Sequence, residues 1–268
     1  MGTLLDALIM GIVEGLTEFL PVSSTGHLIL TGWLLGMNGE RAATFEIIIQ
    51  LGAILAVLVM YWPRFYGLLR PNPERPEERF SGVRGLWLLF LTSLPASLLG
   101  LAEHKAIKAH LFAPHPVALA LAVGAVAILV VESFRRRERF STLDEITPLL
   151  ALGVGFFQCL ALWPGFSRSA ATIMGAMILG ANRRLAAEYS FIAAVPIMCA
   201  ATGYDLLKSM KFLHAADLPF FAVGFVVSFI AAWLAVKGFI HLLSRITLRP
   251  FAVYRLVLAP LVFLFWPE

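Results

Sequence analysis

Apolar runs long enough to cross a lipid bilayer recur along the whole chain, and they constrain its fold more than any other feature. The clearest runs are 45–62, 85–101, 114–133, 185–207, 218–237 and 250–267. Each is about 20 residues long, which matches a hydrocarbon core of roughly 30 Å. Inside lipid, every backbone polar group needs a partner within the protein, so such runs fold as helices. The runs predict an all-α polytopic membrane protein.

Composition agrees with a membrane location over the full length. Apolar residues make up 59% of the chain, charged residues only 14%, and the mean hydropathy is +0.83. Soluble domains carry roughly 25% charged residues. No polar stretch is long enough for a separate soluble domain, so we expect a single membrane domain at 1–268. Basic residues lie in the short connections, which argues against nucleic acid as a partner.

An internal repeat organises the chain. A shift of 144 residues without a gap gives 9 identities in the 35 positions from 11 to 45. The identical pairs are Gly11/Gly155, Leu16/Leu160, Ser23/Ser167, Ile29/Ile173, Leu35/Leu179, Gly36/Gly180, Asn38/Asn182, Ala42/Ala186 and Ala43/Ala187. The repeat predicts two halves, at about 1–133 and 146–268.

Each half begins with two short apolar segments around a polar loop. The first pair is 3–20 and 24–36, and the second pair is 148–163 and 167–180. At a rise of 1.5 Å per residue, the second pair reaches only about 24 and 21 Å. We therefore expect re-entrant hairpins, each followed by three transmembrane helices. An odd number of spans inverts the second half, so the two loops meet near the middle of the membrane, as in many transporters.

The distribution of Lys and Arg predicts the orientation. With this topology, the connections at 63–84, 134–147, 181–184 and 237–249 share one side and hold 14 basic residues, whereas the other side holds 5. The richer side is cytoplasmic by the positive-inside rule. Both termini are then expected outside.

Two carboxylates stand out in the first hairpin. Glu14 and Glu18 are four residues apart in an apolar helix, so they share a face. A carboxylate at such a place costs about 2.5 kcal/mol or more and usually marks a functional site. The pair could hold a divalent cation, or one of them could act as a base. Snorkelling of these side chains to the interface is the structural alternative.

Hydroxyl groups gather in the first loop. Ser23, Ser24 and Thr25 are followed by His27, directly before the second short arm. One hydroxyl would suffice as a helix N-cap. A helix N-terminus in a low-dielectric setting also suits phosphate, and the surplus of hydroxyls favours that interpretation.

The second loop contributes a cation. Arg168 lies between Ser167 and Ser169, where the second arm begins. Its fork can bind phosphate oxygens or pair with a carboxylate of the first loop. A purely structural ion pair is the alternative. Thr172 follows four residues later on the same helix face and could add a hydroxyl.

Two further residue pairs are predicted to support the site or to anchor a helix in the membrane. Glu46 and Gln50 are four residues apart in the third apolar segment and are expected just behind the site. Tyr254 and Arg255 are expected to anchor their segment at the membrane interface.

The two loops also carry a family resemblance. The segments EGLTEFLPVSSTGH at 14–27 and PGFSRSAAT at 164–172 resemble the signature motifs of bacterial undecaprenyl pyrophosphate phosphatases of the bacitracin-resistance type. The likeness extends over the chain and includes FEIIIQLG at 45–52. It implies a hydrolase in the inner membrane that converts the polyprenyl pyrophosphate to its monophosphate and recycles a lipid carrier for peptidoglycan.

The resemblance also implies partners and residue roles. It implies a Mg²⁺ or Ca²⁺ ion with Glu14 and Glu18 as ligands, a site open to the periplasmic or outer face, and competition with bacitracin for the substrate. A homodimer is a further expectation. The expected catalytic residues are Glu14, Glu18, Ser24, His27 and Arg168. The expected substrate-binding residues are Ser23, Thr25, Gly26, Gln50, Gly165, Ser167, Ser169 and Thr172.

Two questions stay open at this point. Either Ser24 or a water molecule attacks the terminal phosphorus, and either Glu18 or His27 takes the proton. A polyprenyl-phosphate transporter or flippase is the alternative function, because inverted repeats with broken helices are typical of transporters.

Overall fold

The computed structural model describes residues 2–37, 39–71, 74–75, 77–134, 137–209, 217–243 and 245–266. Four residues used in the sequence analysis lie outside these ranges. They are Asn38, from the internal repeat, and three basic residues of the orientation argument, Arg135, Arg136 and Lys211. The helices are α1 (Leu4–Thr17), α2 (Ser24–Leu34), α3 (Gly39–Met60), α4 (Trp62–Leu69), α5 (Gly82–His110), α6 (Pro114–Ser133), η1 (Leu143–Glu145), α7 (Pro148–Gln158), η2 (Cys159–Leu162), α8 (Arg168–Ile178), α9 (Arg183–Ser209), α10 (Leu218–Leu243) and α11 (Arg249–Phe265).

Within the described ranges, five helices are long and apolar enough to cross a membrane, namely α3, α5, α6, α9 and α10. Large apolar side chains such as Leu98, Val126 and Leu234 are exposed on their outer surfaces, as lipid contact requires. The prediction of an all-α polytopic membrane protein is confirmed. The expected sixth span, 250–267, corresponds to α11, which has 17 residues and is not among the five. That span stays a prediction.

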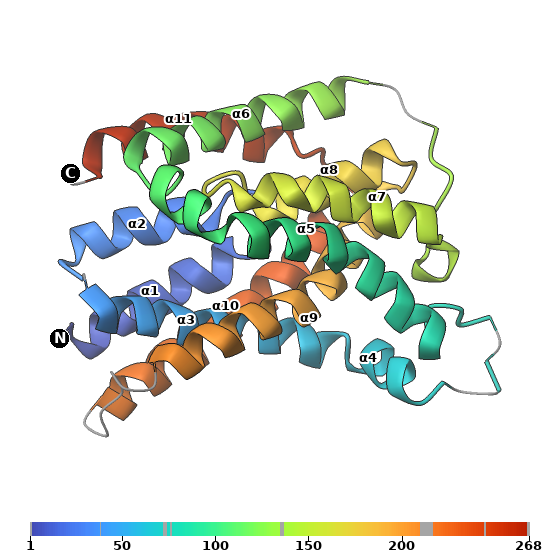
Figure 1. Cartoon of the computed structure of the whole chain (residues 1–268), viewed down its shortest axis with the longest axis horizontal. Helices are drawn as coiled ribbons and strands as arrows, with labels where there is room; N and C mark the ends of the chain where they lie inside the picture. Colours follow the sequence, from blue (N-terminus) through green and yellow to red (C-terminus); the bar gives the residue numbers. More distant parts are fainter. Residues whose placement is uncertain are drawn as a thin grey trace.

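The two short helix pairs enter the bundle from opposite ends. Figure 1 shows α1 and α2 extending from the end that holds both termini, and α7 and α8 extending from the other end, with their loops meeting in the middle. Helix α1 has 14 residues and the other three arms have 11 each. These lengths correspond to about 21 and 17 Å, short of a bilayer core. Membrane re-entrancy itself stays a prediction.

The two loops have the same local geometry. Ser23 (φ 71°) and Ser167 (φ 77°) are the positive-φ residues other than glycine in the described part of the chain. Each is an N-cap whose hydroxyl accepts from the N–H three residues on, at Gly26 (3.5 Å) and Ala170 (3.3 Å). Such a conformation costs of order 1–3 kcal/mol and persists only where the surroundings enforce it.

The helices after the loops also end alike. At the end of α2, Met37 N–H donates to Gly32 O (2.8 Å), and at the end of α8, Ala181 N–H donates to Ala176 O (2.9 Å). The residues before these donors, Gly36 and Gly180, have positive φ, as this helix ending requires. The loop and the helix end therefore match across the 144-residue shift.

Each hairpin packs on a long helix from the other half of the chain. Helix α1 lies against α10, and α7 lies against α5. Close approach depends on aligned glycines: a Cβ on Gly11 would lie 2.7 Å from Gly224 O, and one on Gly155 would lie 2.7 Å from Thr92 O. Small residues allow such backbone contact between membrane helices.

We expect Gly11→Ala and Gly155→Ala to lower the thermal unfolding midpoint of the detergent-solubilised protein, because overpacking a close contact costs about 1–3 kcal/mol. Gly238→Ala in α10 is the matched control, since nothing lies within 4 Å of its added Cβ. Its midpoint should hold or rise, because alanine favours a helix over glycine by about 1 kcal/mol. Equal effects at all three positions would contradict the packing argument.

Candidate functional site

A cavity of about 180 Å³ lies where the two loops meet. Both hairpins contribute to its wall, together with one side chain each from α3 and α9. The lining residues are Glu18, Ser23, Ser24, Thr25, Gln50, Ala161, Pro164, Gly165, Ser167, Arg168 and Met198. Eight of the thirteen residues predicted for the site therefore share one cavity.

Glu18 joins the two loops. It caps the C-terminus of α1, where its N–H donates to Glu14 O (2.9 Å). One carboxylate oxygen pairs with Arg168 Nη2 at 3.2 Å, and the other accepts from the Ser24 hydroxyl at 2.6 Å. Arg168 also donates to Ser190 O (3.2 Å), and its guanidinium lies 5.3 Å from the centre of the Phe19 ring. A buried acid thus orients both a hydroxyl and a cation at the cavity.

Two helix N-termini face this cavity. Ser24 is the first residue of α2, and Arg168 is the first residue of α8. The first N–H groups of a helix have no partner within it and carry the positive end of the helix dipole. Together with the Arg168 guanidinium, they give the cavity the electrostatic character that suits an anion.

Unpaired polar atoms lie beside the cavity. Glu14 is 1% exposed, and its Oε2 atom has no hydrogen-bond partner. The Nε atom of Arg168 is also buried without one. The carboxylates of Glu18 and Glu46 both repel that of Glu14. Buried polar groups are normally paired, so these two atoms are candidates for an interaction with a ligand.

Both ring nitrogens of His27 have hydrogen-bond partners other than Ser24. Its Nδ1 lies 2.7 Å from Ser23 O, and its Nε2 lies 2.6 Å from the Tyr254 hydroxyl. Since a carbonyl oxygen only accepts, Nδ1 carries the proton and Nε2 accepts from Tyr254. The two rings are also stacked, with centroids 5.5 Å apart. His27 therefore holds the backbone of the first loop.

Three other predicted residues lie behind the cavity wall. The Ser169 hydroxyl donates to Leu20 O (2.8 Å) and so links the two loops. The Thr172 and Ser190 hydroxyls are 2.6 Å apart and join α8 to α9. Gly26 is buried against Leu121. These three residues therefore support the cavity wall from behind. Their chain neighbours Thr25 and Arg168 line the cavity itself.

The structure corrects the predicted location of Arg255. It was expected at the membrane interface, but it is 0% exposed and bonds to the backbone of both loops. An ionisable residue inside an apolar segment was the signal available in the sequence. The apolar wall formed by Ala161, Pro164 and Met198 was also missed, because nothing in a sequence distinguishes such residues from ordinary packing.

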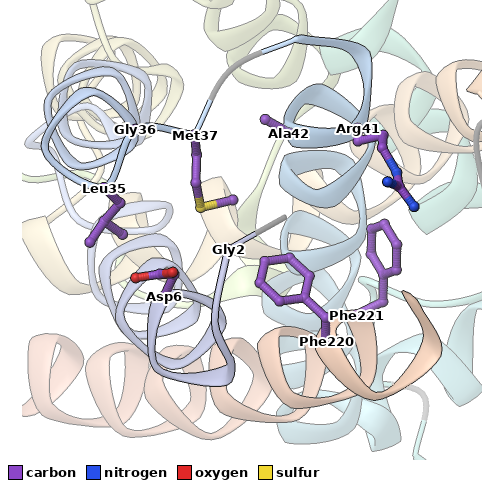
Figure 2. A pocket seen from close by; sticks show the side chains of 9 residues that line it. All are labelled: Gly2, Asp6, Leu35, Gly36, Met37, Arg41, Ala42, Phe220 and Phe221. Atoms are coloured by element: carbon purple, nitrogen blue, oxygen red, sulfur yellow. The ribbon is translucent and has the colours of Figure 1, made fainter. Parts of the chain in front are cut away.

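A second cavity, of about 310 Å³, lies at the end of the bundle near the N-terminus. Figure 2 shows Asp6 and Arg41 on opposite sides of it. Asp6 is held by the Thr3 N–H and hydroxyl (2.5 and 3.0 Å), and Arg41 pairs with Asp217. The cavity between the loops is the better candidate, because eight of the predicted residues line it and two helices begin at it.

The fold and this cavity define a class of protein: a polytopic α-helical membrane protein with a polar cavity between two short helix pairs. Residues 7–261 match the family model described as bacitracin resistance protein BacA. The chain therefore belongs to the BacA family.

Relatives extend over the full chain. An undecaprenyl-diphosphatase of Maridesulfovibrio salexigens is 70% identical, over 99% of this chain and 100% of the relative. A protein of the same name from Nitratidesulfovibrio vulgaris strain DP4 is 69% identical over 99% of both chains. One from Lawsonia intracellularis is 56% identical over 98% of both.

Breaking the Glu18–Arg168 pair should destabilise the protein. We expect Glu18→Gln and Arg168→Met each to cost about 3–5 kcal/mol, because either change leaves a buried charge without its partner. The double variant should lose less stability than the two single variants lose together. Thermal unfolding of all three variants in the same detergent measures this difference. The exposed pair of Arg184 and Glu188 (3.0 Å) is the control, worth about 0–1 kcal/mol. Additive losses at Glu18 and Arg168 would contradict direct coupling.

Proposed function

We propose that this chain hydrolyses undecaprenyl pyrophosphate to undecaprenyl phosphate and inorganic phosphate. The relatives' shared name supports the substrate and the reaction. The observation that carries the proposal is the meeting of Glu18, Ser24 and Arg168 in one cavity between two helix N-termini. This arrangement provides a nucleophile or water site, a base and an anion clamp.

The headgroup has two phosphates, and the cavity has two helix N-termini. We propose that one phosphate lies on the N-terminus of α2 and the other on that of α8, where Arg168 adds a charged fork. Arg168 and the N–H groups would stabilise the charge that develops on the transferred phosphoryl group. The cavity is too small for a polyprenyl chain, so the tail would leave past Ala161 and Met198 toward lipid.

The chemical step needs a base, and geometry favours Glu18. Ser24 already donates to its carboxylate at 2.6 Å. When the Ser24 oxygen, or a water in its place, forms a bond to the terminal phosphorus, the proton passes to Glu18. The bond from that phosphorus to the bridging oxygen breaks, and undecaprenyl phosphate leaves. If Ser24 attacks, a water then hydrolyses the phosphoserine and releases phosphate.

His27 is less suited to the role of base. Both of its ring nitrogens are engaged, with Ser23 O and the Tyr254 hydroxyl. We assign it to hold the strained Ser23 backbone, which in turn places Ser24.

A divalent cation, Mg²⁺ or Ca²⁺, also belongs to the proposal. In the described part of the chain, no three His, Cys, Asp or Glu side chains gather to hold a metal alone. Mg²⁺ is commonly bound by one or two carboxylates plus substrate phosphates, and the unpaired Glu14 Oε2 fits that pattern. Glu14, with Glu18 as neighbour, would hold the ion. The ion would neutralise phosphate charge.

We further propose an inner-membrane location with the site open to the outer face and both termini outside. The charge count supports this orientation, and both termini lie at one end of the bundle (Figure 1). Bacitracin would compete by sequestering the pyrophosphate lipid. Assembly as a homodimer is part of the same proposal.

Phosphate release from undecaprenyl pyrophosphate by the purified protein in detergent tests the function. We expect multiple turnover with Mg²⁺ or Ca²⁺, loss with EDTA, and a decrease in kcat of about 10²–10³-fold in Arg168→Met or Glu18→Gln, because each contributes to charge stabilisation or proton transfer. Arg184→Met, in the exposed pair, is the control. A folded wild type without turnover would contradict the proposal and favour lipid transport.

The attacking group can be identified separately. If Ser24 is the nucleophile, Ser24→Ala should lose nearly all turnover, and acid-quenched wild type should retain ³²P on Ser24 from substrate labelled in its terminal phosphate. If Ser24→Ala keeps most of the turnover, water attacks directly and Ser24 only orients Glu18.

A further inference from the structure

Arg255 connects elements that are far apart in the sequence. It lies in α11, is 0% exposed, and donates to four backbone carbonyls. Two acceptors belong to the loops: Pro21 O, 3.4 Å from Nη1, and Gly165 O, 3.2 Å from Nη2. One guanidinium therefore holds both hairpin tips.

The two loop carbonyls are equivalent in the repeat. Pro21 and Gly165 are 144 residues apart, and each lies two residues before a positive-φ serine, Ser23 or Ser167. Each of these serines lines the cavity and caps a helix that points into it. Position 111, which the repeat aligns with 255, is leucine. A single arginine thus serves both loops.

The rest of the guanidinium is fixed to α6. Nε donates to Leu121 O and Nη2 to Ala120 O, each at 3.2 Å. Gly124, on the next turn of that helix, provides the space: a Cβ there would lie 2.1 Å from Nη2. The group therefore has a fixed location in the bundle.

Resting on the proposed function, we propose that Arg255 is a positioning residue that sets the spacing of the two loops to match the two phosphates of the substrate. Arginine suits this role because its planar fork offers five donors in fixed directions. A lysine ammonium has no such fork. Buried carbonyls in broken helices need partners from within the protein, and here one residue supplies them to both tips.

Two variants test the proposal. Arg255→Lys keeps a charge but removes the fork. Gly124→Ala keeps every hydrogen-bonding group and mainly displaces the guanidinium, because its added Cβ would lie 2.1 Å from Nη2 and 3.1 Å from Phe166 O. Gly238→Ala, with open space around its Cβ, is the matched control. For each, we would measure kcat, KM and the thermal unfolding midpoint, and the affinities for two lipids with the same tail, one with a methylenediphosphonate headgroup and one with a monophosphate.

We expect both test variants to lower kcat by about 100-fold, as small misplacement of reacting groups does. Their preference for the diphosphonate lipid over the monophosphate lipid should shrink by about tenfold, because only the first ligand contacts both tips. The control should match wild type.

Two results would overturn the proposal while leaving the phosphatase function standing. One is wild-type kcat and ligand preference in Gly124→Ala. The other is an equal loss of affinity for both lipids, which would indicate general structural damage. A wild-type protein that neither turns over substrate nor prefers the diphosphonate would overturn the proposed function and the role of Arg255 together.

Discussion

Two interruptions of helix inside an apolar bundle must find hydrogen-bond partners within the protein, because lipid offers none. The chain meets this constraint with buried charges. Arg168 and Glu18 link the loops through side chains, and Arg255 links them through backbone carbonyls. The polar groups that hold the broken helices thus line the cavity or fix the loops that line it, so the stability of the bundle and the shape of the cavity have a common physical origin.

Pairing also explains why these charges persist at such depth. Arg168 has a carboxylate, a carbonyl and an aromatic ring around it, and Glu18 has a cation and a hydroxyl. Desolvation would otherwise be prohibitive. Two buried atoms stay without a hydrogen-bond partner, Glu14 Oε2, one helical turn before Glu18, and Nε of Arg168, which lines the cavity.

The sequence predicted the helical class, and eight of the thirteen residues that it marked line one cavity, because charges in apolar segments are conspicuous. It could not predict which way a side chain points. His27 follows three hydroxyl residues, yet its ring nitrogens bond to Ser23 O and Tyr254. Arg255 looked like an interfacial anchor because its acceptors, Pro21 O and Gly165 O, come from distant segments. A sequence does not show which backbone carbonyls will accept hydrogen bonds from a distant side chain.

The exchange of packing partners between halves has a consequence for biogenesis. Helix α1 leaves the ribosome early but rests on α10, and α7 rests on the earlier α5. Until α10 is inserted, the glycine face of α1 at Gly11 and Gly15 has no helix to receive it. The native packing of the first hairpin is therefore complete only after α10, near the end of the chain, has been synthesised.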